Sequence, residues 1–355
     1  MCGEIFTNLQ AGATGINVRI LLIMDPGIPV PPLLYGGHER LVYLFAEEYR
    51  KLGHQVTLLA GPQSDCSGKT VTFGTNDLNR SKWARFKEAV FVWSYLRKNH
   101  RSFDLIHNFG RLIYLLPVLN ASVNKIMTYG RPVSARGIKI VNTLPNQNLI
   151  FTACSNYCVS TGNAAGTWKT VYNTIDFSQY ELNENVDADA PLMFLGRLDR
   201  VKGVHTAIKV AKATNNKLII AGNISHTPDN FAYFKTEIEP QVDNEQIKYA
   251  GALNDSEKSN YLRKAKALLF PIEWDEPFGM VMIEAMACGT PVIAFNRGSV
   301  PEVVSKETGV IVDTPDEMAH AINNLNHFNR IGCRTEAFKK FDVNKIANDY
   351  LDLYK

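Results

Sequence analysis

Short apolar runs alternate with amphipathic stretches along most of this chain, and this alternation restricts the fold more than any other feature. In the first half the apolar runs predict five strands, over Arg19–Met24, Gln55–Ala60, Asp104–Phe109, Lys125–Tyr129 and Leu149–Ala153. Helical periodicity lies between them, most clearly over Glu39–Leu52 and Ser81–Asn99. Strands that alternate with helices are typical of parallel sheets. The sequence therefore predicts an α/β fold.

The alternation begins again after segment 183–190, which is polar and acidic and is typical of a surface connection. The second series predicts a helix over Gly203–Thr214 and strands over Pro191–Leu198, Lys217–Ala221, Ile247–Ala250, Ala267–Pro271 and Pro291–Phe295. A chain of 355 residues is long for a single core. We expect two Rossmann-like, doubly wound domains that face a cleft, over residues 1–165 and 166–340, followed by an amphipathic segment, 341–355.

Three familiar ligand motifs are incomplete in this chain. No G-x-G-x-x-G follows the first strand, so a nicotinamide dehydrogenase lacks its main fingerprint. The stretch Ser67-Gly-Lys-Thr70 ends like a P-loop, but Gln63 stands where that motif needs glycine. Asp187-Ala-Asp189 precedes a strand, whereas ligands of doubly wound sheets bind beyond the carboxyl ends of strands. We therefore expect no metal site and no cofactor.

Three other stretches lie where a ligand is expected. Gly36 and Gly37 follow the first strand and open a helix, so backbone N–H groups can approach a ligand closely. Arg197 ends a strand and Lys202 precedes the next helix, and two converging cations suit a diphosphate. A flexible turn and surface salt bridging remain the plainer interpretations of these two stretches.

The third stretch surrounds a Pro-Phe-Gly turn with two carboxylates, Glu276 and Glu284. The turn leads into a helix and leaves the amides of Phe278, Gly279 and Met280 without helical partners. Carboxylates repel phosphate but accept hydrogen bonds strongly from hydroxyls. The two acids therefore suit two ends of one elongated, hydroxyl-rich ligand. Alternatively, they only favour the N-terminal half of a helix through its dipole, which explains Glu276 better than Glu284.

These motifs together resemble family 4 of the retaining GT-B glycosyltransferases. Glu276-Pro-Phe-Gly-x4-Glu284, followed by Ala-x-Ala-x-Gly-x-Pro-Val, resembles the E-x7-E signature of that family. The segments around Arg197 and Lys202 resemble its diphosphate-binding stretch, and Gly36-Gly37 matches its glycine loop. Asn173-Thr-Ile-Asp176 resembles its N-G-V-D step between domains, with threonine in place of glycine. The motifs follow the family's order and span about Arg19 to Tyr354.

The resemblance assigns a role to each stretch. Glu276 would accept hydrogen bonds from the donor sugar, Glu284 would hold the nucleotide ribose, and Arg197 and Lys202 would neutralise the departing diphosphate. A divalent metal often does that last task, so the resemblance implies metal-independent transfer. The first domain would bind the acceptor, the second would bind the nucleotide sugar, and the terminal segment 341–355 would cross back to the first domain.

One part of the family pattern is missing. The family often has D-x-x-H-x-H after a strand of the first domain, with the second histidine facing the transferred sugar. Here Asp104-Leu-Ile-His107-Asn-Phe109 keeps the first histidine and replaces the second with phenylalanine. Either His107 or Asn108 substitutes in catalysis, or another side chain such as Arg131 supplies the sugar contact. A structural role for His107 within the strand is the alternative.

The resemblance implies transfer of a hexose, with glucose from a UDP-sugar as the first choice, to an acceptor hydroxyl with retention of configuration. The rivals are a sugar-nucleotide epimerase or phosphorylase of related fold, and an inactive subunit that binds a nucleotide sugar. No acid–base set for epimerisation is evident in the sequence. Phe109 is the one feature that favours the inactive subunit.

Charge is distributed unevenly along the chain. Residues 1–165 hold 17 Lys and Arg against 9 Asp and Glu, whereas the remainder holds 21 against 26. Within 79–101, seven cations face one acid and are interleaved with aromatic residues, a pattern typical of a helix that binds an anionic membrane surface. The alternative is that its apolar side packs on the sheet and its cations are solvated. No nucleic acid is expected as a partner.

Two further features bear on location. The six cysteines lack a metal-binding spacing and suggest reduced thiols. The chain has no apolar run long enough to span a bilayer and no clear secretory signal. We therefore expect a cytoplasmic protein, with peripheral contact at the inner face of the membrane through residues 79–101.

Overall fold

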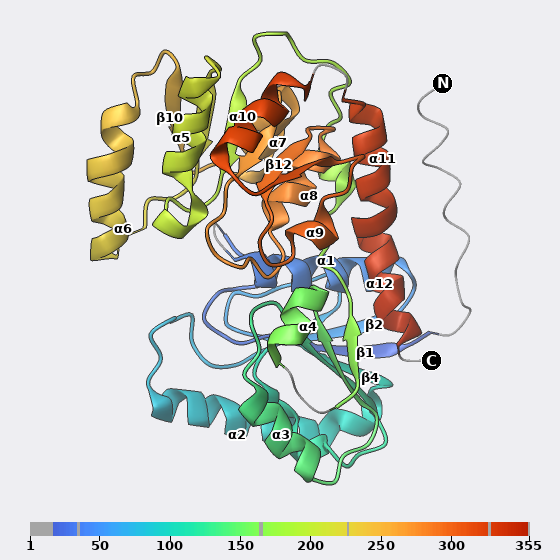
Figure 1. Cartoon of the computed structure of the whole chain (residues 1–355). Coiled ribbons are helices and arrows are strands. Elements are labelled where there is room, and N and C mark those ends of the chain that lie inside the picture. The colour runs from blue at the N-terminus through green and yellow to red at the C-terminus, as the bar shows by residue number, and fades with distance from the viewer. Residues whose placement is uncertain (1–16, 34–35, 163–165, 226, 326–327, 354–355) are drawn as a thin grey trace.

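The computed structural model describes residues 17–33, 36–162, 166–225, 227–325 and 328–353, which fold into two α/β domains (Figure 1). In these ranges, seven parallel strands form the first sheet in the order β3-β2-β1-β4-β5-β6-β7. Their bounds are β1 Arg19–Ile23, β2 Gln55–Ala60, β3 Lys69–Thr72, β4 Leu105–Asn108, β5 Asn124–Tyr129, β6 Leu149–Ala153 and β7 Trp168–Thr170.

The second sheet consists, over the same described ranges, of six parallel strands in the order β10-β9-β8-β11-β12-β13. Their bounds are β8 Leu192–Leu195, β9 Leu218–Ala221, β10 Ile247–Gly251, β11 Leu268–Phe270, β12 Val292–Phe295 and β13 Gly309–Val312. In each sheet, the first strand of the domain, β1 or β8, lies between the next strand of the chain, β2 or β9, and the strand at which the chain crosses to the other side of the sheet, β4 or β11. Each sheet therefore has a switch point where ligands of such folds bind. The two doubly wound domains expected from the sequence are confirmed.

Helices cover the faces of both sheets. Those of the first domain are α1 Gly37–Lys51, α2 Lys82–Asn99, α3 Ala135–Thr143 and α4 Asn156–Gly162. Those that follow are α5 Val204–Ala213, α6 Pro228–Tyr233, α7 Asp255–Lys264, α8 Met280–Ala287, α9 Val300–Val303, α10 Pro315–Asn323, α11 Arg330–Phe341 and α12 Val343–Asp352. Within the described part of the chain, no helix is both long and apolar enough to cross a bilayer.

The sequence explains these elements locally. Strand β1 reads Arg-Ile-Leu-Leu-Ile, and its four apolar residues are buried on both faces because helices cover both sides of a parallel sheet. Helix α7 begins with a capping box, in which the Asn254 side chain accepts from the Glu257 amide and the Glu257 carboxylate accepts from the Asn254 amide.

The predicted strands are present, but three edge strands were not predicted. Strands β3, β7 and β13 are three or four residues long, lie at or next to sheet edges and are only partly buried. Strand β3 contains Lys69 and Thr70 of the P-loop-like stretch, which therefore forms part of a sheet edge. Strand β7 pairs with β6 beyond residue 165, where the sequence placed the boundary, so the first sheet extends to Thr170.

The chain returns to its first domain at the end. Figure 1 shows α11 beside the second domain and α12 continuing down to the first. Helix α12 packs on α1 through an apolar stripe that includes Ile346 and Tyr350, and Tyr350 meets Phe45 edge-on at 5.2 Å between ring centroids. Asn344 also donates to Glu48 of α1 at 2.9 Å. The two domains are therefore tied by the last helix as well as by the central connection.

Further direct contacts join the two domains. The Phe278 ring lies 6.2 Å from that of Tyr172 and 5.8 Å from that of Phe341, between the two sheets. The Glu302 carboxylate of α9 accepts the backbone N–H groups of Asn156 and Tyr157, each at 2.7 Å. A side chain of the second domain thus caps helix α4 of the first.

Candidate active site

The strongest cluster of predicted residues lies at the switch point of the second sheet. Strands β8 and β11 are neighbours, so the loops that leave their carboxyl ends meet there. The loop after β8 carries Arg197 and Lys202, and the loop after β11 carries Trp274 and Glu276. The sheet order thus brings together residues that are about 75 positions apart in the sequence.

Lys202 and Glu276 contact each other directly. Lys202 Nζ lies 2.5 Å from Glu276 Oε2, and the two side chains are only 15% and 14% exposed. Trp274 holds both groups: its Nε1 donates to Glu276 Oε2 at 2.9 Å, and Lys202 Nζ lies 5.0 Å from its ring centroid. The predicted sugar-binding acid and one predicted phosphate-binding cation are therefore direct partners.

Arg197 lies on the more open side of the same loop. Its side chain is 50% exposed, and Nη2 pairs with Asp199 Oδ2 at 2.8 Å. The loop needs glycine at 203, where φ is +76° and a Cβ atom would lie 1.9 Å from the Pro271 carbonyl oxygen. This close approach fastens the Arg197–Lys202 loop to the end of β11, next to Glu276.

The turn after Glu276 presents bare amides as the sequence predicts. Gly279 caps α8 at φ +81° without a side-chain hydrogen bond. Among the described residues, the N–H groups of Phe278, Gly279 and Met280 have no hydrogen-bond acceptor. The Phe278 side chain is buried in the interface, so only its backbone remains for a ligand. A helix N-terminus of this kind attracts phosphate or a polar sugar edge.

Glu284 is more deeply buried than Glu276. Its side chain is 8% exposed, and Oε1 accepts from Lys258 Nζ at 2.8 Å and from the Tyr180 hydroxyl at 3.1 Å. Burial, together with the Glu284 charge, raises the pKa of Tyr180 well above its usual value, so the phenol stays a donor. Neither Lys258 nor Tyr180 was predicted, because both lie far from the E-x7-E stretch in the sequence.

A chain of charges links Glu284 to the first domain. Lys258 also pairs with Asp255 at 2.8 Å, and Asp255 accepts from Arg40 of α1. Arg40 lies one turn beyond Gly36 and Gly37, which form the N-terminus of α1. The glycine loop therefore faces the second domain across the Arg40–Asp255 ion pair.

The structure does not place His107 in this site. His107 is fully buried in β4, its Nε2 lies 2.8 Å from the Thr128 hydroxyl, and its ring packs 4.1 Å from Phe109 and 4.4 Å from Tyr350. Burial lowers the pKa of His107 to about 3, so the ring is neutral. Its catalytic assignment is therefore corrected to a structural one, since a side chain without accessible surface touches no substrate. Phe109, 4% exposed, belongs to the same packed group.

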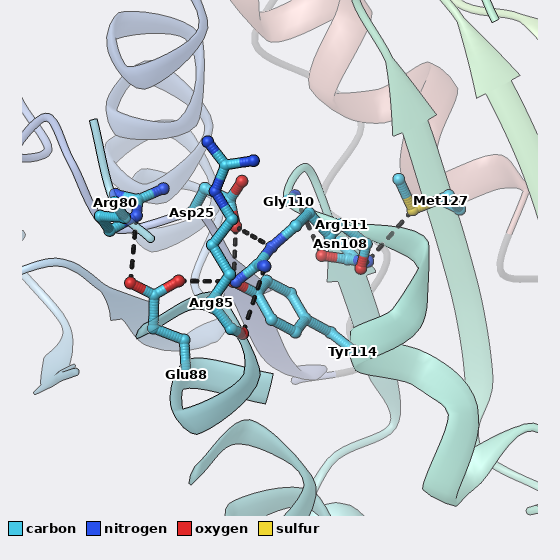
Figure 2. Close-up of polar contacts among 9 residues, drawn as sticks. All are labelled: Asp25, Arg80, Arg85, Glu88, Asn108, Gly110, Arg111, Tyr114 and Met127. Atoms are coloured by element: carbon cyan, nitrogen blue, oxygen red, sulfur yellow. Dashed lines mark hydrogen bonds and ion pairs between the residues drawn. The ribbon is translucent and has the colours of Figure 1, made fainter. Parts of the chain in front are cut away.

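Polar side chains that the sequence did not identify gather at the switch point of the first sheet (Figure 2). Asp25 Oδ1, just after β1, accepts from the Tyr114 hydroxyl at 2.5 Å and from Arg111 Nε at 3.1 Å. Arg111 also pairs with the buried Glu88 of α2 at 2.7 Å. Asp25 stands alone in the sequence, without a motif, and only the neighbouring positions of β1 and β4 reveal the cluster.

Metal ligands do not gather in the part of the chain that the structure describes: no three His, Cys, Asp or Glu side chains there are placed to hold an ion. Asp189 of the D-x-D stretch precedes β8 and pairs with Lys217 at 2.9 Å, with its side chain 77% exposed.

The chain was compared with known proteins. Residues 181–330 match the family model described as glycosyl transferases group 1, and this range includes Arg197, Lys202, Glu276 and Glu284. An uncharacterised protein of the cps region of Klebsiella pneumoniae is 30% identical over 217 residues, which are 56% of this chain; the chain spans 57% of that relative's length. A putative glycosyltransferase of Bacillus subtilis, YtcC, is 27% identical over 86% of this chain and 83% of its own length.

Solved structures share the two-domain arrangement over nearly the whole chain. The Anabaena protein HepE, in complex with UDP and glucose, is similar with a TM-score of 0.72 at 19% identity, over 95% of this chain and 99% of its own. This likeness shows the fold, and the GT-B architecture expected from the sequence is confirmed.

Proposed function

We propose that this protein is a retaining glycosyltransferase of family 4 that moves a hexose from a nucleotide diphosphate sugar to an acceptor hydroxyl. The contact between Lys202 and Glu276 carries the proposal, because it joins a phosphate-binding cation to a hydroxyl-binding acid at the switch point of the second sheet. The match of residues 181–330 to group 1 glycosyl transferases supports it over the same residues. A UDP-linked glucose is the first donor to test, supported by the UDP and glucose bound in HepE.

In the proposed reaction, the bond between the sugar anomeric carbon and the diphosphate breaks while the acceptor oxygen bonds to the same face of that carbon. The leaving phosphate oxygen takes the acceptor proton. Arg197 and Lys202 stabilise the charge that develops on the leaving group, together with the amides of Gly279 and Met280. Glu276 holds sugar hydroxyls and Glu284 holds the ribose, so no carboxylate acts as a nucleophile. We propose that no metal takes part.

The experiment presents the purified protein with a set of nucleotide sugars and follows binding by thermal shift, since a ligand of the native state raises its stability. Reactions with UDP-glucose, without and with hydroxyl acceptors, are then analysed for released UDP and for the anomeric configuration of the product. Transfer with retention is expected. An epimerised donor would instead indicate an epimerase, and sugar 1-phosphate formed with free phosphate would indicate a phosphorylase. Donor binding without any turnover would indicate an inactive subunit.

We also propose peripheral contact with an anionic membrane through residues 79–101. On α2 the side chains of Trp83 and Phe86 are stacked and exposed, whereas Ala89, Val92 and Leu96 pack into the core. Exposed aromatics beside cations suit the headgroup region of a bilayer. After sedimentation with phosphatidylglycerol vesicles at low salt, we expect the wild type in the pellet with the vesicles. A variant with Trp83 and Phe86 changed to Ser and Lys82 and Lys87 changed to Gln should stay in the supernatant. Equal recovery of both proteins in the supernatant contradicts this contact.

A further inference from the structure

The cluster around Asp25 has the form of a binding site as well as of a structural network. Asp25 lies at the carboxyl edge of the first sheet, and its side chain is 28% exposed. Arg111 and Tyr114 both bond to Oδ1. Among the described residues, Oδ2 has no hydrogen-bond donor. The carboxylate is therefore held rigidly with one oxygen available, and such an oxygen accepts strongly from a hydroxyl.

The Arg85 guanidinium has no hydrogen-bond or ion-pair partner among the described residues. Figure 2 shows the Arg85 guanidinium near Asp25, with no contact drawn to it. Arg85 is exposed; its backbone N–H donates to the Ser81 carbonyl at 3.0 Å and its backbone carbonyl accepts from Arg111 Nη1 at 3.3 Å. The side chain therefore remains for a ligand, and its planar fork suits a phosphate.

Arg80 adds a second positive charge beneath this edge. Its side chain is 9% exposed and pairs through Nε with Glu88 at 3.0 Å, whereas Nη1 is buried without a hydrogen-bond acceptor among the described residues. Nη1 lies against the loop after β1, only 2.3 Å from where a Cβ atom on Gly27 would stand. Arg80 is therefore too deeply buried to contact a ligand, but its charge adds to the positive potential beside Asp25.

A further cation, Arg131, lies at the carboxyl end of the strand next to β4. Arg131 follows β5 and is exposed, and β5 lies next to β4 in the sheet. Burial raises the pKa of Glu39, in the first turn of α1; the charge of Asp25 adds to this rise and that of Arg131 opposes it. The charges of Asp25 and Arg131 thus both reach Glu39. Arg80, Arg85, Arg111 and Arg131 outnumber the acids Asp25, Glu39 and Glu88 there.

We infer that this edge, which we call the Asp25 edge (Asp25, Arg80, Arg85, Arg111 and Arg131), binds an acceptor that carries a phosphate ester beside its hydroxyl. The phosphate lies against Arg85, Arg80 contributes charge from beneath, and Asp25 Oδ2 accepts from the hydroxyl. The inference rests on the proposed function, because it names the class of acceptor for that reaction. The phosphate belongs either to a soluble polyol phosphate or to the headgroup of a phospholipid.

The experiment measures binding to the Asp25 edge apart from the donor site. Isothermal titration calorimetry compares glucose 6-phosphate with glucose, and inositol 1-phosphate with inositol, on protein saturated with UDP. A second arm compares vesicles of phosphatidylcholine with vesicles that also contain phosphatidylinositol. We expect the phosphorylated member of one arm to bind and its unphosphorylated or zwitterionic counterpart not to bind. The arm that responds identifies the source of the phosphate.

Two variants test the residues. Arg85→Gln should weaken binding of the phosphorylated ligand about 10-fold or more, as expected for one lost charge-assisted contact. Arg97→Gln, also exposed on α2 but near its other end, is the matched control and should bind as the wild type does. The inference is overturned if the phosphorylated and unphosphorylated ligands bind equally well, or if neither arm shows binding. It is also overturned if Arg85→Gln and Arg97→Gln weaken binding equally. UDP binding is measured first and tests the proposed function separately. A protein that does not bind UDP contradicts the proposed function, whereas a protein that binds UDP but no phosphorylated acceptor contradicts only the inference about the Asp25 edge.

Discussion

The ammonium group of Lys202 lies 2.5 Å from the carboxylate of Glu276, so the two ends of the proposed donor site are joined directly. Because both side chains are largely buried, the pair keeps each group from standing alone in a region of low dielectric. In the proposed donor complex, the diphosphate would compete with Glu276 for Lys202, and the sugar hydroxyls would compete with Lys202 for Glu276. The proposed donor binding is therefore an exchange of partners.

The first prediction concerns the charged groups of this exchange. Glu276→Gln and Arg197→Ala should each lower kcat about 100-fold, since loss of a contact to developing charge costs on the order of 3 kcal/mol. Steady-state kinetics at saturating donor provides the measurement. Arg200→Ala is the control, because Arg200 lies in the same loop but pairs with Glu237. Near wild-type turnover in both site variants would show that the residues are wrongly assigned.

Trp274 provides a second prediction, as a positioning residue. Trp274→Phe keeps an aromatic face for Lys202 but loses the N–H that holds Glu276, whereas Trp274→Leu loses both. Donor KM should rise about 10-fold in the first variant and further in the second, because hydrogen bonds to charged groups contribute roughly 1.5–3 kcal/mol. Steady-state kinetics with varied donor gives KM and kcat for each variant, and the change in KM is compared with the change in kcat. An identical KM in the two variants contradicts a separate role for the ring face.

The third prediction addresses the buried ion pair between Glu284, which we propose holds the ribose, and Lys258. Glu284→Ala should raise donor KM more than it lowers kcat. Lys258→Met leaves Glu284 buried with only Tyr180 as donor, so urea unfolding should show a loss of roughly 3 kcal/mol or more in the free energy of unfolding. The double variant Glu284→Gln, Lys258→Met should recover part of this loss. Independent, additive losses would mean that the two charges are not coupled.

Asp342 gives a prediction about pH. Burial, with smaller contributions from the charges of Glu48 and Asp176, raises the pKa of this helix-capping carboxyl to about 6. The native state therefore binds more protons than the unfolded state between pH about 4 and 6, and this group lowers stability as pH rises through that window. Asp342→Asn keeps a capping side chain without the charge. Its stability advantage should grow from pH 4 to pH 6, to at most ~3 kcal/mol, and then stay level. An advantage that is independent of pH contradicts the assignment.

The fifth prediction follows from the proposed absence of a catalytic metal. Activity with UDP-glucose should persist after dialysis against EDTA, because Arg197 and Lys202 supply the positive charge that the leaving diphosphate needs. Turnover is measured before and after dialysis, and again after addition of Mg²⁺ or Mn²⁺. Activity that disappears with EDTA and returns with either ion decides against the proposal.

The sequence predicted the central strands well, because strands buried on both faces, such as β1 and β2, are continuous apolar runs. The edge strands β3, β7 and β13 escaped detection because they are short and half exposed. Residues of the proposed donor site could be named where they lie within one motif, as Glu276 and Glu284 do. Trp274 was not predicted although it precedes Glu276 by only two residues. Its indole N–H, so close to an acid in the sequence, could have indicated a hydrogen bond to that carboxylate. Asp25 and Arg111 are 86 residues apart, and only strand order joins them.

The cap that Glu302 places on helix α4 makes the start of that helix depend on the other domain. The two Glu302 oxygens accept the amides of Asn156 and Tyr157 across the interface, and Ser155 Oγ donates to the Pro277 carbonyl at 2.6 Å beside them. The first amides of a helix have no acceptor within the helix itself. Helix α4 therefore takes acceptors for its first amides from the second domain, so the folding of this short helix is coupled to the contact between the domains.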